Sequence, residues 1–191
     1  MGLVILLAAS LLAQDDPCES IYKFKPGTTW SFIGVRTGKG PNFSKMELKV
    51  LSGTPGRTEL EAKRYRGGDE PEVVTVRWSV DQGILSWAEI RDGKERDQMQ
   101  LHKAGAKKGD TWEWTRDDDQ KAQGKSLGVE EVKVPAGTYK DAIHTRVEPQ
   151  GGPEKFGIDF YFAPGVGPVK MVAGDERGSL TLELKEFKSA K

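Results

Sequence analysis

The dominant pattern along the chain is an alternation of apolar and polar residues, interrupted at short intervals by Gly, Pro, Asp and Asn. In EVVTVRWSV, the residues Val74, Val76 and Trp78 fall on one side of an extended chain, and in SLTLELKEF so do Leu180 and Leu182. A period of two is typical of strands with one buried and one solvent-facing side. We therefore predict an all-β fold, an antiparallel meander of about twelve strands.

Two parts of the chain repeat each other in the same order. GTTWSF at 27–32 and GDTWEW at 109–114 share a Gly, a Thr and an aromatic pair, and ELKVLSGT at 47–54 aligns with EVKVPAGT at 131–138. The other aligned pairs are Trp78 with Phe162 and Gly83 with Gly167. Self-similarity of this kind is typical of a duplicated structural unit. We expect two pseudo-symmetric six-strand repeats that form a curved sheet or a half-barrel.

The repeats and the first residues of the chain define the expected segments. The first repeat covers 25–101, a linker covers 102–108, and the second repeat covers 109–191. Residues 1–14 are largely apolar and are followed by two Asp residues, which is typical of a cleaved secretory signal peptide; the alternatives are a buried N-terminal segment and a misplaced start codon. Residues 15–24 then form an N-terminal tail. We expect a periplasmic or secreted protein with no membrane span, because the apolar run is shorter than the roughly 20 residues that a spanning helix needs.

Turn chemistry explains most of the repeated residues. In VPAGTY, Pro135 suits the first position of a turn, and Gly137 suits the left-handed position that closes it. In FAPGVGPV, Pro164 and Gly165 suit a type II turn. The complete set of predicted structural turn residues is Gly53, Gly83, Pro135, Gly137, Pro164, Gly165 and Gly167. A signature made of turn residues favours a structural duplication over a duplicated catalytic motif.

The second repeat resembles a known group of proteins. The opening Gly-x-x-Trp-x-aromatic, VPAGTY at 134–139 and FYFAPGVGPVK at 160–170 are similar to a pattern in exported bacterial proteins of uncharacterised function. That group usually has Val-Pro-Ala-Gly-Thr-Phe and Trp-Tyr-Ala-Pro-Gly-Val-Gly-Leu-Val-Lys, so this chain departs from it at Phe160 and Pro168. The resemblance implies an envelope location and a β-rich, non-enzymatic scaffold without catalytic residues. The plan is also loosely similar to half-barrel lipoprotein carriers of the bacterial envelope.

The charge of the chain is balanced, with 29 basic and 29 acidic residues. A protein that binds nucleic acid or an anionic membrane carries an excess of basic residues, so we expect neither partner. Cys18 is the only cysteine in the sequence, so the chain has no internal disulfide.

No group of residues predicts a reaction. His102 and His144 lack a second ligand at metal-binding spacing, and we expect no metal and no cofactor. A Gly-x-Ser-x-Gly motif is absent, and the sequence places no base beside Cys18. The carboxylates 117–119 are adjacent rather than alternating, which favours a solvated hairpin turn over a calcium loop. We therefore predict that the protein is not an enzyme.

The aromatic residues are the main resource for binding. The pairs Trp30 with Phe32 and Trp112 with Trp114 each share one side of a strand, and Trp78 and Trp87 add two more indoles. All of these except Trp87 are the candidate ligand-binding residues. Two interpretations stay open: they fill the core, or part of their surface is open to an acyl chain, a hydrophobic peptide or a sugar ring.

The expected function follows from these observations. The leading hypothesis is a non-enzymatic exported envelope protein that acts as a binding or scaffold module for an envelope component. The alternative is a carrier of a lipid or another apolar ligand in an aromatic-lined groove. An open apolar groove would favour the carrier, and a filled core would favour the scaffold.

Overall fold

The computed structural model describes residues 19–38, 43–150 and 156–191, and the predicted signal peptide and Cys18 lie outside the described residues. The described residues form one short helix, α1 (Glu19–Tyr22), and twelve strands. The strands are β1 (Thr29–Gly38), β2 (Lys45–Thr54), β3 (Arg57–Tyr65), β4 (Glu72–Asp81), β5 (Ile84–Arg91), β6 (Lys94–Lys103), β7 (Thr111–Thr115), β8 (Lys121–Val134), β9 (Gly137–Pro149), β10 (Gly157–Ala163), β11 (Gly167–Asp175) and β12 (Gly178–Lys188). The predicted all-β fold is confirmed.

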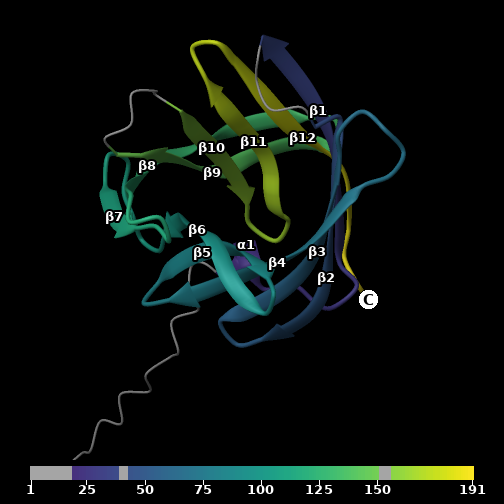
Figure 1. The fold of residues 1–191 in the computed structure, drawn as a ribbon, viewed down its shortest axis with the longest axis horizontal. Helices are drawn as coiled ribbons and strands as arrows, with labels where there is room; N and C mark the ends of the chain where they lie inside the picture. Colours follow the sequence, from purple (N-terminus) through teal and green to yellow (C-terminus); the bar gives the residue numbers. More distant parts are fainter. Residues whose placement is uncertain (1–18, 39–42, 151–155) are drawn as a thin grey trace, which may run out of the picture.

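All twelve strands belong to one antiparallel sheet in the order β6-β5-β4-β3-β2-β1-β12-β11-β10-β9-β8-β7. Each strand pairs with the next strand of the chain, except that β6 does not pair with β7. In addition, β1 pairs with β12 along its whole length, from Thr29 opposite Lys188 to Gly38 opposite Gly178. The sheet curls around an interior to form a nearly closed barrel (Figure 1). Strands β6 and β7 are the two ends of the sheet.

The strand order consists of two runs of six consecutive strands, β1 to β6 and β7 to β12, which meet where β1 pairs with β12. Two six-strand repeats would produce this order, and the equivalence of 25–101 with 109–191 stays a prediction. One aligned position needs correction. Gly53 lies inside β2 opposite Thr58, and Pro55 with Gly56, at φ +74°, makes the turn. A Pro-Gly pair is the stronger turn former, because Pro presets the first φ and Gly supplies the positive one.

The other predicted turn residues lie in or beside connections between strands. Pro135 lies between β8 and β9, and Gly137 begins β9 with φ +147°. Gly83 lies between β4 and β5 at φ +74°. Pro164 and Gly165 connect β10 to β11, where Gly167 follows as the first residue of the strand.

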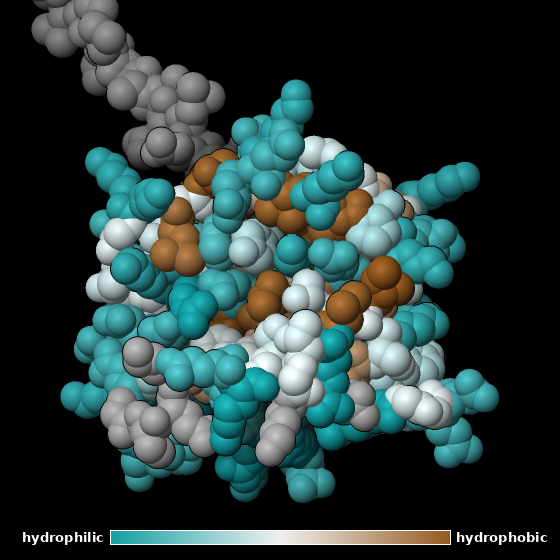
Figure 2. Space-filling view, turned by 90° about the horizontal axis from the view of Figure 1, so that it is seen from above, coloured by the Kyte–Doolittle hydropathy of each residue, from teal (hydrophilic) through white to brown (hydrophobic). Residues whose placement is uncertain are grey.

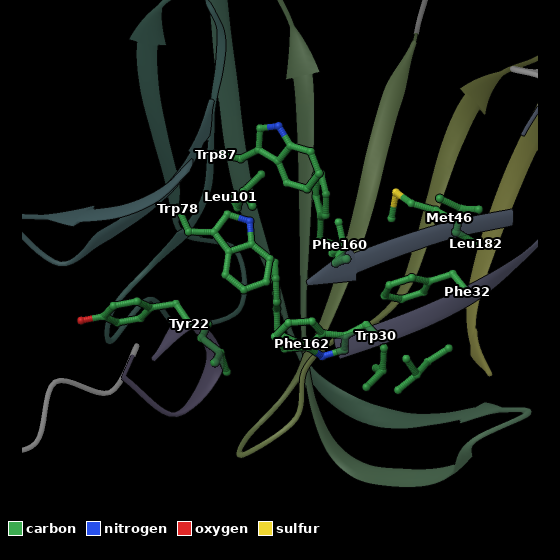
Figure 3. Close-up of a cluster of buried hydrophobic side chains, with 14 of the residues drawn as sticks. Tyr22, Trp30, Phe32, Met46, Trp78, Trp87, Leu101, Phe160, Phe162 and Leu182 are labelled. Carbon is green, nitrogen blue, oxygen red and sulfur yellow. The ribbon is translucent and has the colours of Figure 1, made fainter. Parts of the chain in front are cut away.

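The interior of the barrel is packed with large apolar side chains. Trp30, Phe32, Trp78 and Phe162 are among the largest fully buried side chains of the described chain. The rings of Trp30 and Trp78 meet edge to face, with centroids 5.8 Å apart. Figure 3 shows these side chains converging on the interior from different strands. Aromatic side chains bury more apolar area than other residues, so this cluster contributes a large part of the hydrophobic stabilisation.

Helix α1 closes one end of the barrel. Ile21 and Tyr22 are buried, and Phe24 packs edge to face on Trp30 with ring centroids 4.8 Å apart. The Tyr22 carbonyl accepts a hydrogen bond from the Thr58 hydroxyl at 3.3 Å, and the Gly165 N–H donates to the carbonyl of Ser20 at 2.7 Å. The segment 15–24 was predicted as an N-terminal tail. Its apolar residues Ile21 and Tyr22 lie in the core instead, with Phe24 packed against it, because they cover an end of the interior that would otherwise face water.

A seam separates the two ends of the sheet, β6 and β7, since no backbone ladder joins them within the described chain. Side chains bridge the seam instead. The indole N–H groups of Trp112 and Trp114 donate to the carbonyls of Gln100 and Gln98, each at 3.3 Å. On β9, the buried Thr145 hydroxyl donates to the carbonyl of Leu101 at 2.7 Å. These bonds hold β6 against the strands of the second half.

The seam predicts the effect of one glycine substitution. A methyl group on Gly124 of β8 would overlap the indole ring of Trp112. We expect Gly124→Ala to displace this indole from Gln100 and to lower the free energy of unfolding by about 1–3 kcal/mol, as overpacking does. Chemical denaturation measures the effect. Gly68→Ala is the matched control, because its methyl group would meet open space; equal stability of the two variants would contradict the described seam.

The β8–β9 turn predicts a smaller effect. Gly137 has φ +147°, and no other residue lies within 4 Å of the place where a side chain would begin, so only the backbone opposes a substitution. We expect Gly137→Ala to lower the free energy of unfolding by about 1 kcal/mol. Chemical denaturation measures the difference, with Gly68→Ala as the control. An unchanged free energy of unfolding in Gly137→Ala would contradict the positive φ of this turn.

Candidate functional site

An apolar pocket of about 280 Å³ opens into the interior of the barrel. The pocket lies toward the end of the barrel opposite α1, as two strands show. On β3, Thr58 contacts α1, whereas Arg64, further along the strand, lines the pocket. On β12, Phe187 packs on Phe24 beside α1, whereas Leu180, at the other end of the strand, lines the pocket. The apolar lining residues come from both halves of the sheet and the segments beside them: Phe43, Met46, Trp87, Met99, Phe156, Ile158, Phe160, Met171, Ala173, Leu180 and Leu182.

The shape of this lining suits a flexible apolar guest. Figure 3 shows Trp87, Phe160, Met46 and Leu182 reaching toward the interior from four strands. Methionines such as Met46 contribute unbranched, adaptable side chains that can repack around different shapes. On the face seen in Figure 2, brown apolar surface is visible between teal hydrophilic side chains, so apolar groups reach the surface of the molecule.

Two charged residues project into this apolar interior. Arg64 follows Leu60 and Ala62 on the inner side of β3, and Glu89 follows Trp87 on the inner side of β5. Their side chains are only 15% and 8% exposed, and they form an ion pair through Arg64 Nη2 and Glu89 Oε1. Buried charges are costly unless they are paired and hydrogen-bonded, and this pair meets both conditions.

A second guanidinium completes the environment of Glu89. Arg91 contacts Glu89 Oε2 through Nη2 at 2.6 Å and Nε at 3.2 Å, and it also contacts Asp97 at 3.0 Å. Burial alone would favour the neutral acid, but the hydrogen bonds from Arg91 and Arg64 outweigh it and hold the pKa of the Glu89 carboxyl below its usual value. Glu89 is therefore ionised at neutral pH, and both its oxygens have guanidinium partners.

The rim of the pocket lies beside the seam. Asp97 of β6 and Arg116, which directly follows β7, both line the pocket from the two ends of the sheet. The Asp97 N–H donates to the carboxylate of Asp117 at 3.0 Å. The Arg116 side chain is 34% exposed, and its Nε lies 3.5 Å from Asp118. Charged groups therefore border one side of a pocket whose other walls are apolar.

The five predicted ligand-binding residues lie elsewhere. Trp30, Phe32 and Trp78 are in the filled part of the core, and the Trp30 indole donates to the carbonyl of Val166 at 2.6 Å. Trp112 and Trp114 bridge the seam. All five side chains are used for packing, three of the indoles also donate to backbone carbonyls, and none of the five lines the apolar pocket.

Sequence reasoning missed the residues that do line the pocket, although one signal was present. The period of two assigns Leu60, Ala62 and Arg64 to one face of their strand, and Trp87 and Glu89 to one face of theirs. A charged residue on an otherwise apolar face of a strand is a candidate for a functional position. The methionines and Ala173 carried no comparable signal, because any core accepts such residues.

The described residues also contain a polar cluster on the outer side of the sheet. The ring of His144 lies between two carboxylates, with Nδ1 2.6 Å from Glu130 and Nε2 3.0 Å from Asp159, and it stacks on Tyr161 at 4.1 Å. Burial, together with the charges of Asp159 and Glu130, raises the pKa of the Tyr161 hydroxyl to about 12. The two carboxylates bind different ring nitrogens, so they do not converge on one point. Both ring nitrogens of His144 thus have a carboxylate partner.

A larger hollow of about 710 Å³ lies along β1, β2, β3 and β12, but its lining is mostly polar and includes several Lys and Glu side chains. Within the described part of the chain, no group of three or more His, Cys, Asp or Glu residues could hold a metal ion. The only described helix, α1, is too short to cross a membrane.

Comparisons with known proteins show the fold. No family model matches the chain, and no curated protein matches its sequence. A protein of Bacteroides fragilis that is described as exported and as having a YmcC-like fold superposes with a TM-score of 0.57 at 14% identity, over 87% of this chain and 97% of that one. A protein of Parabacteroides distasonis described as a lipoprotein gives a TM-score of 0.57 at 14% identity, over 86% of this chain and 96% of its own. The chain therefore shares its fold with both.

The buried carboxyl predicts how stability depends on pH. A group whose pKa is lower in the folded protein stabilises it above the unfolded pKa, and this contribution is lost as the pH falls through the folded pKa. We expect the wild type's advantage in unfolding free energy over Glu89→Gln to be largest above about pH 5 and to shrink toward about pH 3. Urea denaturation across this range measures it. Glu186→Gln, at an exposed position of β12, is the control, and a pH-independent gap for Glu89→Gln would contradict the expectation.

Proposed function

We propose that the protein is a non-enzymatic exported binding protein that carries an apolar ligand in the pocket at the open end of its barrel. One observation supports this most directly: the core is filled at the α1 end, whereas about 280 Å³ remains open between Trp87, Phe160 and Met171. A protein without a guest would gain stability by filling such a space, since each unfilled methylene position forfeits packing energy.

The size of the pocket limits the guest. Pockets for small molecules usually range from roughly 300 to 1,000 Å³, so this one lies just below the lower bound. A single acyl chain or a compound of similar volume fits this space better than a whole lipid with several chains. The adaptable lining of Met46, Met99 and Met171 suits chains that differ in length or unsaturation.

Two observations support export. Residues 1–14 have the apolar character of a secretory signal peptide. The two proteins that share the fold are described as exported and as a lipoprotein, respectively. An exported carrier would also serve a physical need, because free lipids are poorly soluble in the water between membranes. A scaffold role, with an envelope component bound to the outer surface, is the alternative if the pocket takes no ligand.

Titration with the apolar fluorescent probe N-phenyl-1-naphthylamine tests the proposed function. We expect saturable binding to the wild type, and a loss of affinity of roughly tenfold or more in Ala173→Phe, because the ring fills the pocket from β11. Met99→Trp, which fills the pocket from β6, should act in the same direction.

Ala136→Phe is the matched control, because it adds the same ring at an exposed turn outside the pocket. Thermal unfolding shows whether each variant is folded under the conditions of the titration. Unchanged probe affinity in folded Ala173→Phe and Met99→Trp would reject the pocket as the binding site. Absence of probe binding to the wild type would favour the scaffold.

A further inference from the structure

The charged groups of the pocket bear on the head group of the ligand, in addition to its apolar tail. This inference rests on the proposed function. Arg64 and Glu89 interrupt an inner face that is otherwise apolar, beside Trp87 and Ala62. Replacing such a buried pair with apolar residues of similar volume is often neutral or stabilising. Stability alone therefore does not explain why the pair is there.

The hydrogen-bonding capacity of the pair is unevenly used. Both carboxylate oxygens of Glu89 are occupied, one by Arg64 and one by Arg91. A guanidinium has five N–H donors. The side chain of Arg64 makes one hydrogen bond to Glu89 and no other within the described residues, so most of its donors remain available at the pocket wall.

A second guanidinium group, at the rim of the pocket, also has unused hydrogen-bond donors. The guanidinium of Arg116 lines the pocket, and its contact with Asp118, at 3.5 Å, is at the limit for a hydrogen bond. The carboxylate of Asp97, by contrast, has Arg91 at 3.0 Å. Within the described residues, the pocket therefore offers unused donors from two guanidinium groups, whereas both lining carboxylates already have cationic partners.

We propose that the ligand is a single-chain amphiphile with an anionic head group. Its tail occupies the apolar space between Trp87, Phe160 and Met171, and its head accepts hydrogen bonds from Arg64 and Arg116. The planar fork of a guanidinium matches the oxygens of a carboxylate or a phosphate, and such hydrogen bonds are about twice as strong as neutral ones. Glu89 holds Arg64 at the wall and is a positioning residue.

A matched series of decyl compounds tests the head group, because the tail stays constant. Decanoate, decyl phosphate, decanol and decyltrimethylammonium are titrated at pH 8 against protein loaded with N-phenyl-1-naphthylamine. We expect decanoate and decyl phosphate to displace the probe at concentrations about tenfold lower than decanol, as a charge-assisted contact provides, and the cationic compound to be the weakest. The two anions distinguish a carboxylate head from a phosphate head.

Two substitutions locate the contact. Arg64→Met and Arg116→Met keep the length of the side chain and remove its charge, and we expect each to weaken decanoate binding by about tenfold without changing decanol binding. Retained decanol binding also shows that the pocket of each variant is intact. Arg57→Met is the matched control: its side chain pairs with Glu95 outside the pocket, and it should change neither affinity.

The outcomes separate this inference from the proposed function. If decanol binds as tightly as decanoate, or if the arginine variants weaken both equally, the anionic head group is overturned while apolar binding stands. If no decyl compound displaces the probe, the carrier function fails as well. Binding of decanoate that weakens with added salt, beside decanol binding that does not, would support the contact with arginine.

Discussion

The pairing of β1 with β12 is the constraint on which the rest of the structure depends. These strands lie at opposite ends of the described sequence, yet their ladder covers all of β1 and closes the two halves into one curved sheet. Curvature turns the alternation of residues into a difference between inside and outside, because every second side chain must then point into a confined volume. Without this pairing, two six-strand sheets would each expose an apolar face to water.

The confined volume is filled unevenly, and this gradient distinguishes the two ends of the barrel. At one end, Trp30, Trp78 and the apolar residues of α1 are buried and pack into one cluster. At the other end, longer and more flexible side chains line an opening, and the Arg64–Glu89 pair lies among them. The large indoles near α1 hold the walls in place, so the opposite end can remain open without collapse of the sheet.

Much of the fold could be predicted from local patterns. Alternation such as that of Val74, Val76 and Trp78 identifies strands and their inner sides, and Pro135 with Gly137 marks a turn. The prediction of a turn at Gly53 was wrong, because it was transferred from Gly137 by the alignment of the repeats. The Pro55–Gly56 pair decides where the chain turns instead. The role of residues 19–24 could not be predicted either, because no local sequence pattern shows that a short segment covers an end of the barrel formed by distant strands.

The site was harder to predict for a physical reason. Alternation shows which residues point inward, but not at which level along the barrel they lie, and the level decides whether a residue fills the core or lines an opening. Large aromatic residues such as Trp30 and Trp78 suit both a filled interior and a ligand-binding surface, so alternation alone does not separate the two interpretations. Charge on an inner face, as at Arg64, was the more informative signal.

The seam has a consequence for how the molecule opens. Elsewhere in the sheet, neighbouring strands separate only when a whole ladder of backbone hydrogen bonds breaks, but β6 and β7 are joined by the indoles of Trp112 and Trp114. Single hydrogen bonds contribute about 0.5–1.5 kcal/mol each, so we expect lateral separation of the two halves at this seam to cost less free energy than separation at any ladder of the sheet. Met99 and Arg116 line the pocket beside this seam, so under the proposed function a bound chain would lie next to the place where the sheet is joined most weakly, and it could leave sideways rather than along the axis.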